Sequence, residues 1–156
     1  IWLACAQTAE GGLPQNSSIS GEAYWRGVQL DQVAMPILLA WRLARAGGLR
    51  EFDPYSLVLR AARYLILHGP VTGQDRWEEN SGYSPSTLAV IIAGLVSAAD
   101  LAGGREHQVT AEFLLDYADW LVAHLEEWVV TSCGDLVEGK PQHYIRLTPS
   151  DPNQVV

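Results

Sequence analysis

Cysteines and basic residues are scarce in this sequence, and each shortage excludes a class of protein. Cys5 and Cys133 are the two cysteines, so the chain can form at most one disulfide and cannot build a structural zinc site from cysteine alone. Lys and Arg number 10 against 18 Asp and Glu, which gives a formal net charge of -8. Because nucleic-acid binding normally needs a basic face, we expect no nucleic-acid partner.

No hydrophobic run in the sequence is long enough to cross a membrane. The longest, residues 88–99, falls short of the roughly 20 residues that span a bilayer, and no basic segment with a cleavage site opens the chain. We therefore expect no membrane partner. Hydrophobic residues make up 48% of the 156 positions and charged residues 18%. This composition supplies enough apolar side chains to fill the core of one domain, and it excludes a chain that is disordered throughout.

Both ends of the sequence indicate a piece of a larger unit. The chain has no initiating Met, and residues 1–6 look like the last turns of a helix already under way. Residues 151–156 are loop-like and no closing element follows them. We expect the chain to be a segment of a larger catalytic or binding domain, truncated at both ends.

Hydrophobic periodicity predicts two one-sided helices. The first starts at Asp53-Pro54, an N-cap acceptor followed by a proline that needs no N–H bond at the first helical position. The second spans residues 107–130 and places its acidic residues opposite its apolar ones. Such stripes predict one buried and one solvated face.

Two further helices are predicted that have no polar face. They cover residues 29–46 and the stretch from Ser84-Pro85 to a Gly-Gly stop at residues 103–104. A helix that is apolar all round is expected to be buried all round. Pro36 lies inside the first of them, which predicts either a later helix start or a kink.

Buried and one-sided helices alternate along the chain, as they do in a double layer where inner helices line a centre and outer helices cover them. Strand signals are weak. The connections from outer to inner helices, residues 8–28 and 69–83, are long, whereas the inner-to-outer ones, 47–52 and 103–106, are short glycine turns. The long loops are expected to gather at one end, joined there by residues 131–156. The pattern favours a toroid of helical hairpins over a bundle, and a solenoid of helix pairs suits it equally.

The densest group of reactive side chains is the segment QDRWEEN at residues 74–80. Two adjacent carboxylates beside an arginine and a tryptophan suit acid catalysis. A carboxyl that packs on an indole loses hydration, which raises its pKa and keeps it protonated as a general acid. The alternative interpretation is a solvated acidic loop near a helix N-terminus.

A second group, YWRGVQLD at residues 24–31, occupies the equivalent position in the preceding hairpin. Aromatic rings with amide and acid groups form a platform for a sugar, whose C–H face stacks on an indole while its hydroxyls bond to polar tips. The alternative makes Gln29 and Asp31 helix-start residues and Trp25 a core aromatic. Two Trp-containing polar loops at one end nevertheless resemble a binding site.

Other chemistries find little support in the sequence. The four histidines lack metal-ligand spacing, and there is no Gly-rich phosphate loop and no G-x-S-x-G motif. No cysteine and histidine have a spacing that indicates a catalytic pair. We expect neither a metal nor a cofactor.

The chain resembles the catalytic domain of family 15 glycoside hydrolases, the glucoamylases and glucodextranases, and its prokaryotic branch in particular. The matching stretches run over almost the whole chain: GLPQN (12–16), YWRGVQLD (24–31), QDRWEE (74–79), TLAV (87–90) and HYIR (143–146).

This resemblance implies an all-α fold, part of an (α/α)6 barrel with alternating inner and outer helices, and an active site at the end where the long loops gather. Glu78 matches the general acid of the family. Arg76, Trp77 and Glu79 match residues that contact sugar around the cleavage point. Trp25 matches a tryptophan that packs near the acid, and Gln29 and Asp31 fall in its supporting motif.

The implied function is that of an inverting exo-acting α-glucosidase, which releases β-glucose from the non-reducing ends of α-glucans. In the family the general base comes from a later part of the barrel, and an Arg-Asp pair that grips the terminal glucose comes from an earlier part; we assign neither here. We expect the isolated chain to be inactive and its exposed helix faces to need the rest of the barrel or self-association. Two alternatives stay open: a different α-glucosidic substrate, such as dextran or trehalose, and a non-catalytic helical-repeat module that binds protein or glycan.

Overall fold

Four long helices make up most of the computed structural model, which describes residues 2–24 and 27–151. They are α2 (Leu30–Arg45), α3 (Tyr55–His68), α4 (Pro85–Gly103) and α5 (Gln108–Val129), preceded by the short α1 (Trp2–Ala6). Two short strands, β1 (Val130–Thr131) and β2 (His143–Tyr144), pair antiparallel after α5. All four predicted helices are confirmed, with boundaries that differ by one or two residues.

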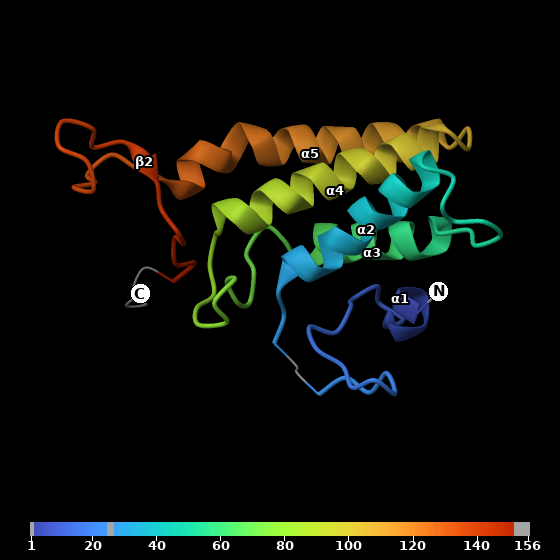
Figure 1. Cartoon of the computed structure of the whole chain (residues 1–156). Helices are drawn as coiled ribbons and strands as arrows, with labels where there is room; N and C mark the ends of the chain where they lie inside the picture. Colours follow the sequence, from blue (N-terminus) through green and yellow to red (C-terminus); the bar gives the residue numbers. More distant parts are fainter. Residues whose placement is uncertain (1, 25–26, 152–156) are drawn as a thin grey trace.

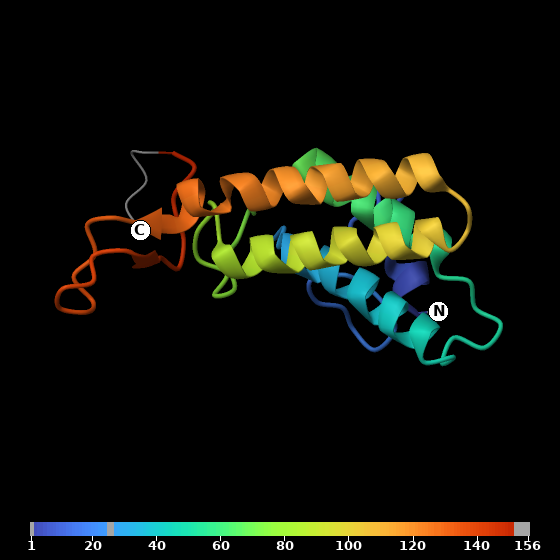
Figure 2. The same ribbon diagram turned by 90° about the horizontal axis from the view of Figure 1, so that it is seen from above.

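The helices form two hairpins, α2 with α3 and α4 with α5 (Figure 1). α4 packs against α5, α2 and α3, while α2 packs against α3 and α4. Figure 2 shows α4 and α5 side by side along their lengths. The two helices predicted as inner therefore pack on each other, and the two predicted as outer cover them.

Local chemistry explains where the helices begin. Asp53 accepts a hydrogen bond from the Tyr55 backbone N–H at 3.0 Å, so it caps α3 from one position further out than predicted. Ser84 precedes α4 in an extended conformation, with Pro85 at the first turn. α2 runs unbroken from Leu30 through Pro36, so a later start after the proline is wrong.

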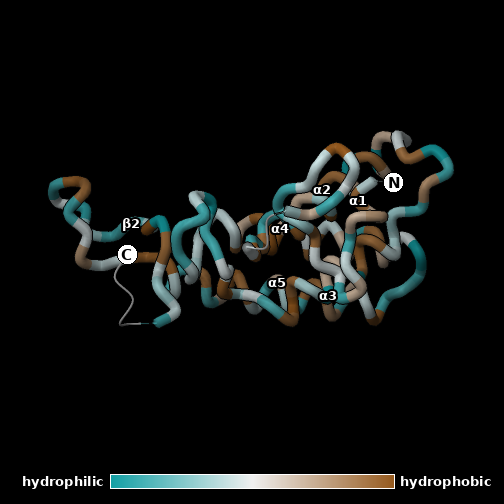
Figure 3. The backbone as a smooth tube through the Cα atoms, turned by 90° about the horizontal axis from the view of Figure 1, so that it is seen from below, coloured by the Kyte–Doolittle hydropathy of each residue, from teal (hydrophilic) through white to brown (hydrophobic). Residues whose placement is uncertain are grey.

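The core consists of the apolar faces that the helices turn toward one another, and hydrophobic stretches follow the helices in Figure 3. The prediction that α2 and α4 are buried on every side is nevertheless wrong for the described residues. Met35 and Leu39 of α2 are 46% and 47% exposed, and Val96 of α4 is 45% exposed. The reason is geometric, because an inner helix needs neighbours on two sides and here the neighbours cover only one.

α4 is also long and apolar enough to cross a membrane, judged by length and composition only. This helix extends beyond the apolar run at residues 88–99, so the prediction that no segment is long enough is wrong for α4. In the structure α4 packs among three other helices, and half of its apolar stretch is buried there, so its composition agrees with a place in the core.

The long connections lie at one end of the helices, as predicted. In Figure 1 the connection between α3 and α4 and the segment that follows α5 lie at the left end, and the two short turns lie at the right end. The N-terminal loop reaches the same left end where it enters α2. This arrangement brings segments that are far apart in the sequence to the start of the two inner helices.

Candidate active site

Both residue groups singled out in the sequence meet at the start of α2. The Gln29 side-chain amide donates to the Asp75 carbonyl oxygen at 2.8 Å, and the Gln74 N–H donates to the Val28 carbonyl oxygen at 3.0 Å. The first N–H of α2, from Leu30, donates to the Thr72 hydroxyl at 3.2 Å. The two loops are thus directly hydrogen-bonded to each other. The loop that contains Thr72 also caps α2, the helix that follows the other loop. Trp25 lies outside the described residues.

Asp75 shapes the turn that carries the paired glutamates. Its side chain is 1% exposed, and its Oδ1 accepts the backbone N–H groups of Trp77 at 3.2 Å and Glu79 at 3.1 Å. Its backbone N–H donates to the Asn80 carbonyl and its carbonyl accepts from the Glu78 N–H, at 2.8 and 2.9 Å. A buried carboxylate therefore closes the loop around residue 78.

Glu78 has a φ of 64°, in the left-handed region that residues with a side chain seldom adopt. Such conformations persist where the surroundings hold them and gather at functional sites. The surroundings here include Gln15, whose side-chain amide donates to Glu78 Oε1. The Gln74 amide donates to the Glu78 carbonyl at 3.3 Å.

The environment expected around the acid is only partly formed. Trp77 is 61% exposed and the Glu78 side chain is exposed as well. The described residues therefore do not cover the Glu78 carboxyl with an indole and do not dehydrate it. A general acid at this position depends on atoms from elsewhere for that covering.

Arg146 joins the loop from the opposite end of the chain. Its guanidinium donates to Glu79 Oε2 at 3.0 Å, lies 3.4 Å from Asp75 Oδ2, and sits 5.5 Å from the centre of the Trp77 ring. No individual role for Arg146 or Gln15 is predicted from the sequence. The available signal was that each lies in a stretch that matches the family, HYIR and GLPQN.

Asp31 and Arg76 are near these groups in sequence, but their side chains form no hydrogen bond or ion pair with them. Asp31 is half-buried in the first turn of α2, where the helix dipole stabilises a negative charge. Arg76 is exposed. Neither side chain forms a hydrogen bond or ion pair with another described residue. The structure brings together Gln29, Trp77, Glu78 and Glu79, and leaves these two at the margin.

Metal ligands and thiols contribute nothing to this cluster. In residues 2–24 and 27–151, no three His, Cys, Asp or Glu side chains are grouped so that they could hold a metal ion. Cys5 and Cys133 are both free and exposed.

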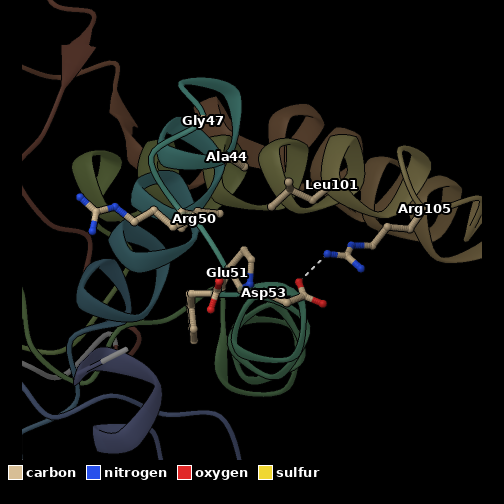
Figure 4. Close-up of a pocket in the computed structure, with 10 residues that line it drawn as sticks. Ala44, Gly47, Arg50, Glu51, Asp53, Leu101 and Arg105 are labelled. Atoms are coloured by element: carbon tan, nitrogen blue, oxygen red, sulfur yellow. Dashed lines mark hydrogen bonds and ion pairs between the residues drawn. The ribbon is translucent and has the colours of Figure 1, made fainter.

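A hollow of about 460 Å³ lies at the other end of the helices, away from the paired glutamates (Figure 4). It is formed by the turn between α2 and α3 and the end of α4, and Arg105 forms an ion pair with Asp53 beside it. Arg105 also stacks over the Tyr55 ring, 4.6 Å from its centre. These contacts connect the two short turns and serve the fold.

Comparison with known proteins agrees with the geometry. The model of glycosyl hydrolases family 15 matches residues 7–150. A glucoamylase from Clostridium sp. (strain G0005) is 42% identical over 154 residues, which is 97% of this chain and 21% of the relative. The crystal structure of a bacterial glucoamylase complexed with acarbose matches with a TM-score of 0.82 and 41% identity, over 94% of this chain and 21% of that one. The chain therefore spans about one fifth of the length of these relatives. The structural match confirms the expected fold, a part of an all-α (α/α)6 barrel.

Proposed function

The chain belongs to glycosyl hydrolase family 15, and on this premise we propose that it forms part of an inverting, exo-acting α-glucosidase of the glucoamylase or glucodextranase type. Its substrate is an α-glucan, from whose non-reducing ends the enzyme releases β-glucose. The observation that carries the proposal is the loop at residues 75–79. There Glu78 has left-handed backbone geometry and its side chain is bonded by Gln15, from a separate segment.

Glu78 is the general acid in this proposal. It donates its proton to the glycosidic oxygen as the bond to the anomeric carbon breaks, so the leaving sugar departs as a neutral alcohol. Water attacks the anomeric carbon from the opposite face and gives its proton to a carboxylate base, which in inverting enzymes lies about 6.5–9.5 Å from the acid. We place that base outside this chain.

The neighbours of Glu78 bind the sugar in this proposal. The Trp77 indole is exposed and offers a flat face for the C–H side of a glucose ring. Glu79 offers carboxylate oxygens to sugar hydroxyls, and Arg76, which bonds to no other described side chain, offers N–H donors. Gln29 supports this surface from the start of α2 through its bond to the Asp75 carbonyl oxygen. Trp25 and Asp31 receive a supporting role from the matching family motif alone.

We further propose that residues 1–156 are one segment of a single catalytic domain and are inactive alone. Support comes from α2 and α4, whose exposed apolar side chains Met35, Leu39 and Val96 are what further barrel helices would cover. Self-association could cover the same face in the isolated chain.

A chimera tests the proposed function. We would replace the matching fifth of the Clostridium glucoamylase with this chain and follow maltooligosaccharide and isomaltooligosaccharide hydrolysis by NMR. The chimera should release β-glucose, and the ratio between the two substrates reports the linkage preference. Glu78→Gln should lower kcat by about 10²- to 10⁴-fold, the usual worth of a general acid, whereas the exposed Glu138→Gln should not.

Other outcomes separate the alternatives. Acarbose binding that survives Glu78→Gln while hydrolysis is lost supports a catalytic role, since the amide keeps the shape and removes the proton. Hydrolysis that is equally fast in both variants makes Glu78 a solvated surface acid. Release of α-glucose refutes an inverting reaction, and glucose release by the 156-residue chain alone refutes its proposed inactivity.

A further inference from the structure

Arg146 lies in a segment that is firmly attached to the helices. The Ile145 N–H donates to the Val129 carbonyl at the end of α5 at 2.9 Å, and Thr148 exchanges two backbone hydrogen bonds with Tyr83, at 2.8 and 2.9 Å. The Thr148 hydroxyl also donates to the Trp128 carbonyl. Arg146 therefore projects from a backbone that is fixed on both sides, to the end of α5 and to the loop that leads into α4.

The loop that Arg146 contacts carries three carboxylates in five residues, Asp75, Glu78 and Glu79. Asp75 is the buried one, and its Oδ2 accepts no hydrogen bond from a described residue. Arg146 Nε, 3.4 Å away, is the one cation within ion-pair distance of it in the part of the chain that the structure describes. Arg76, next to Asp75 in sequence, is exposed and does not take this place.

Asp75 and Glu79 are also the residues that define the loop. Asp75 Oδ1 holds the N–H groups of Trp77 and Glu79, while the Glu79 carboxylate accepts from Arg146 at 3.0 Å. The guanidinium covers the Trp77 ring at 5.5 Å. One arginine thus contacts the residue before Glu78, the residue after it, and the buried carboxylate that closes the turn.

We propose that Arg146 is a positioning residue for the general acid: it neutralises Asp75 and anchors Glu79, and so holds the loop in the conformation that presents Glu78. Arg146 acts through these two carboxylates and takes no proton. An arginine suits this task better than a lysine because its planar fork serves two acceptors at once. The proposal rests on the proposed function for its effect on catalysis, but its effect on the loop is independent of it.

The test uses the full-length chimera with Arg146→Met, Arg146→Lys and, as a matched control, Arg63→Met on the exposed side of α3. Methionine keeps the length of the stem and removes charge and donors. We expect Arg146→Met to lower kcat by about 10- to 100-fold, the size of effect that small misplacements of catalytic groups have. Arg146→Lys should recover part of the loss, KM should rise less than kcat falls, and Arg63→Met should change neither.

Amide hydrogen exchange gives a second readout that does not depend on activity. The Trp77 and Glu79 amides should exchange faster in Arg146→Met, with the amides in the middle of α4 and α5 unchanged. Adding Asp75→Asn should reduce the effect of Arg146→Met, because asparagine keeps the Oδ1 acceptor and removes the buried charge.

Every other result contradicts either the positioning role of Arg146 or the proposed function. Unchanged kcat and unchanged loop exchange overturn the positioning role. Faster exchange throughout the helices with unchanged kcat per acarbose-titrated site also overturns it, because Arg146 is then a general stabiliser. Faster loop exchange in a chimera whose unmodified form does not hydrolyse glucans supports the hold on the loop and refutes the proposed function.

Discussion

Glu78 depends for its conformation on one residue close to it in the chain and on one that is distant. A left-handed backbone at a residue with a side chain costs roughly 1–3 kcal/mol unless the surroundings compensate. Asp75 closes the turn from within, and Gln15 bonds the side chain from a loop 63 residues earlier. The carboxylate of the proposed acid is therefore oriented by a contact that no local pattern contains.

A change at Gln15 tests this orientation at the scale of one residue. Gln15→Leu in the chimera removes the donor to Glu78 Oε1 and should lower kcat by about tenfold, which corresponds to ~1.4 kcal/mol of barrier. Gln15→Glu should do at least as much, because a second carboxylate repels the first. Gln142→Leu, at an exposed position, is the control. Equal kcat in all three variants would show that Glu78 needs no partner on this side.

Loops that enter the inner helices are connected to each other and to the segment after α5. Thr72 and Gly82 exchange two backbone hydrogen bonds of 3.0 Å, and next to them Tyr83 pairs with Thr148. Gly82 has a φ of 153°, and a Cβ built there would lie 2.2 Å from the Thr148 carbonyl oxygen. Only a residue without a side chain lets these three backbone segments come so close.

Gly82→Ala is the corresponding prediction at the scale of an element. The substitution should separate the 72–83 loop from residue 148, destabilise the chimera by about 1–3 kcal/mol and increase exchange of the Tyr83 and Thr148 amides. Gly103→Ala, where a Cβ meets nothing within 4 Å, should be close to neutral. If both glycine variants show the same protection at Tyr83, the close approach of the two backbones has no energetic consequence.

Considered as a whole, the described chain covers one side of its inner helices and leaves the other uncovered. Leu39 faces outward from α2 at 47% exposure, as Met35 does at 46%. Exposed apolar groups that are contiguous mark surfaces that other protein covers. The fifth of the relatives' length that this chain spans agrees with a barrel completed by other helices.

Paired leucine and valine substitutions test whether this face is covered in the whole protein. Leu39→Gln should destabilise the chimera by about 1.5–3 kcal/mol, the value of a buried leucine side chain, and lower its Tm by several degrees. Val109→Gln, at a site 82% exposed on α5, should leave Tm nearly unchanged. In the isolated chain Leu39→Gln should instead reduce self-association in light scattering. A Tm unaffected by Leu39→Gln would mean that the rest of the barrel does not cover α2.

The helices, their order and the end at which the long loops meet could all be predicted from the amino-acid pattern, because periodicity, capping and loop length are local properties of a chain. The convergence of residues 24–31 and 74–80 followed from the same pattern, since each precedes an inner helix, and the bond from Gln29 to the Asp75 carbonyl confirms it. Burial of α2 and α4 on all sides was predicted wrongly because burial depends on neighbours that this chain does not supply. The roles of Gln15 and Arg146 came only from the folded arrangement, which places Arg146 beside Glu79 across 67 residues. Contacts at that separation depend on how the hairpins pack, and no spacing rule along the sequence encodes them.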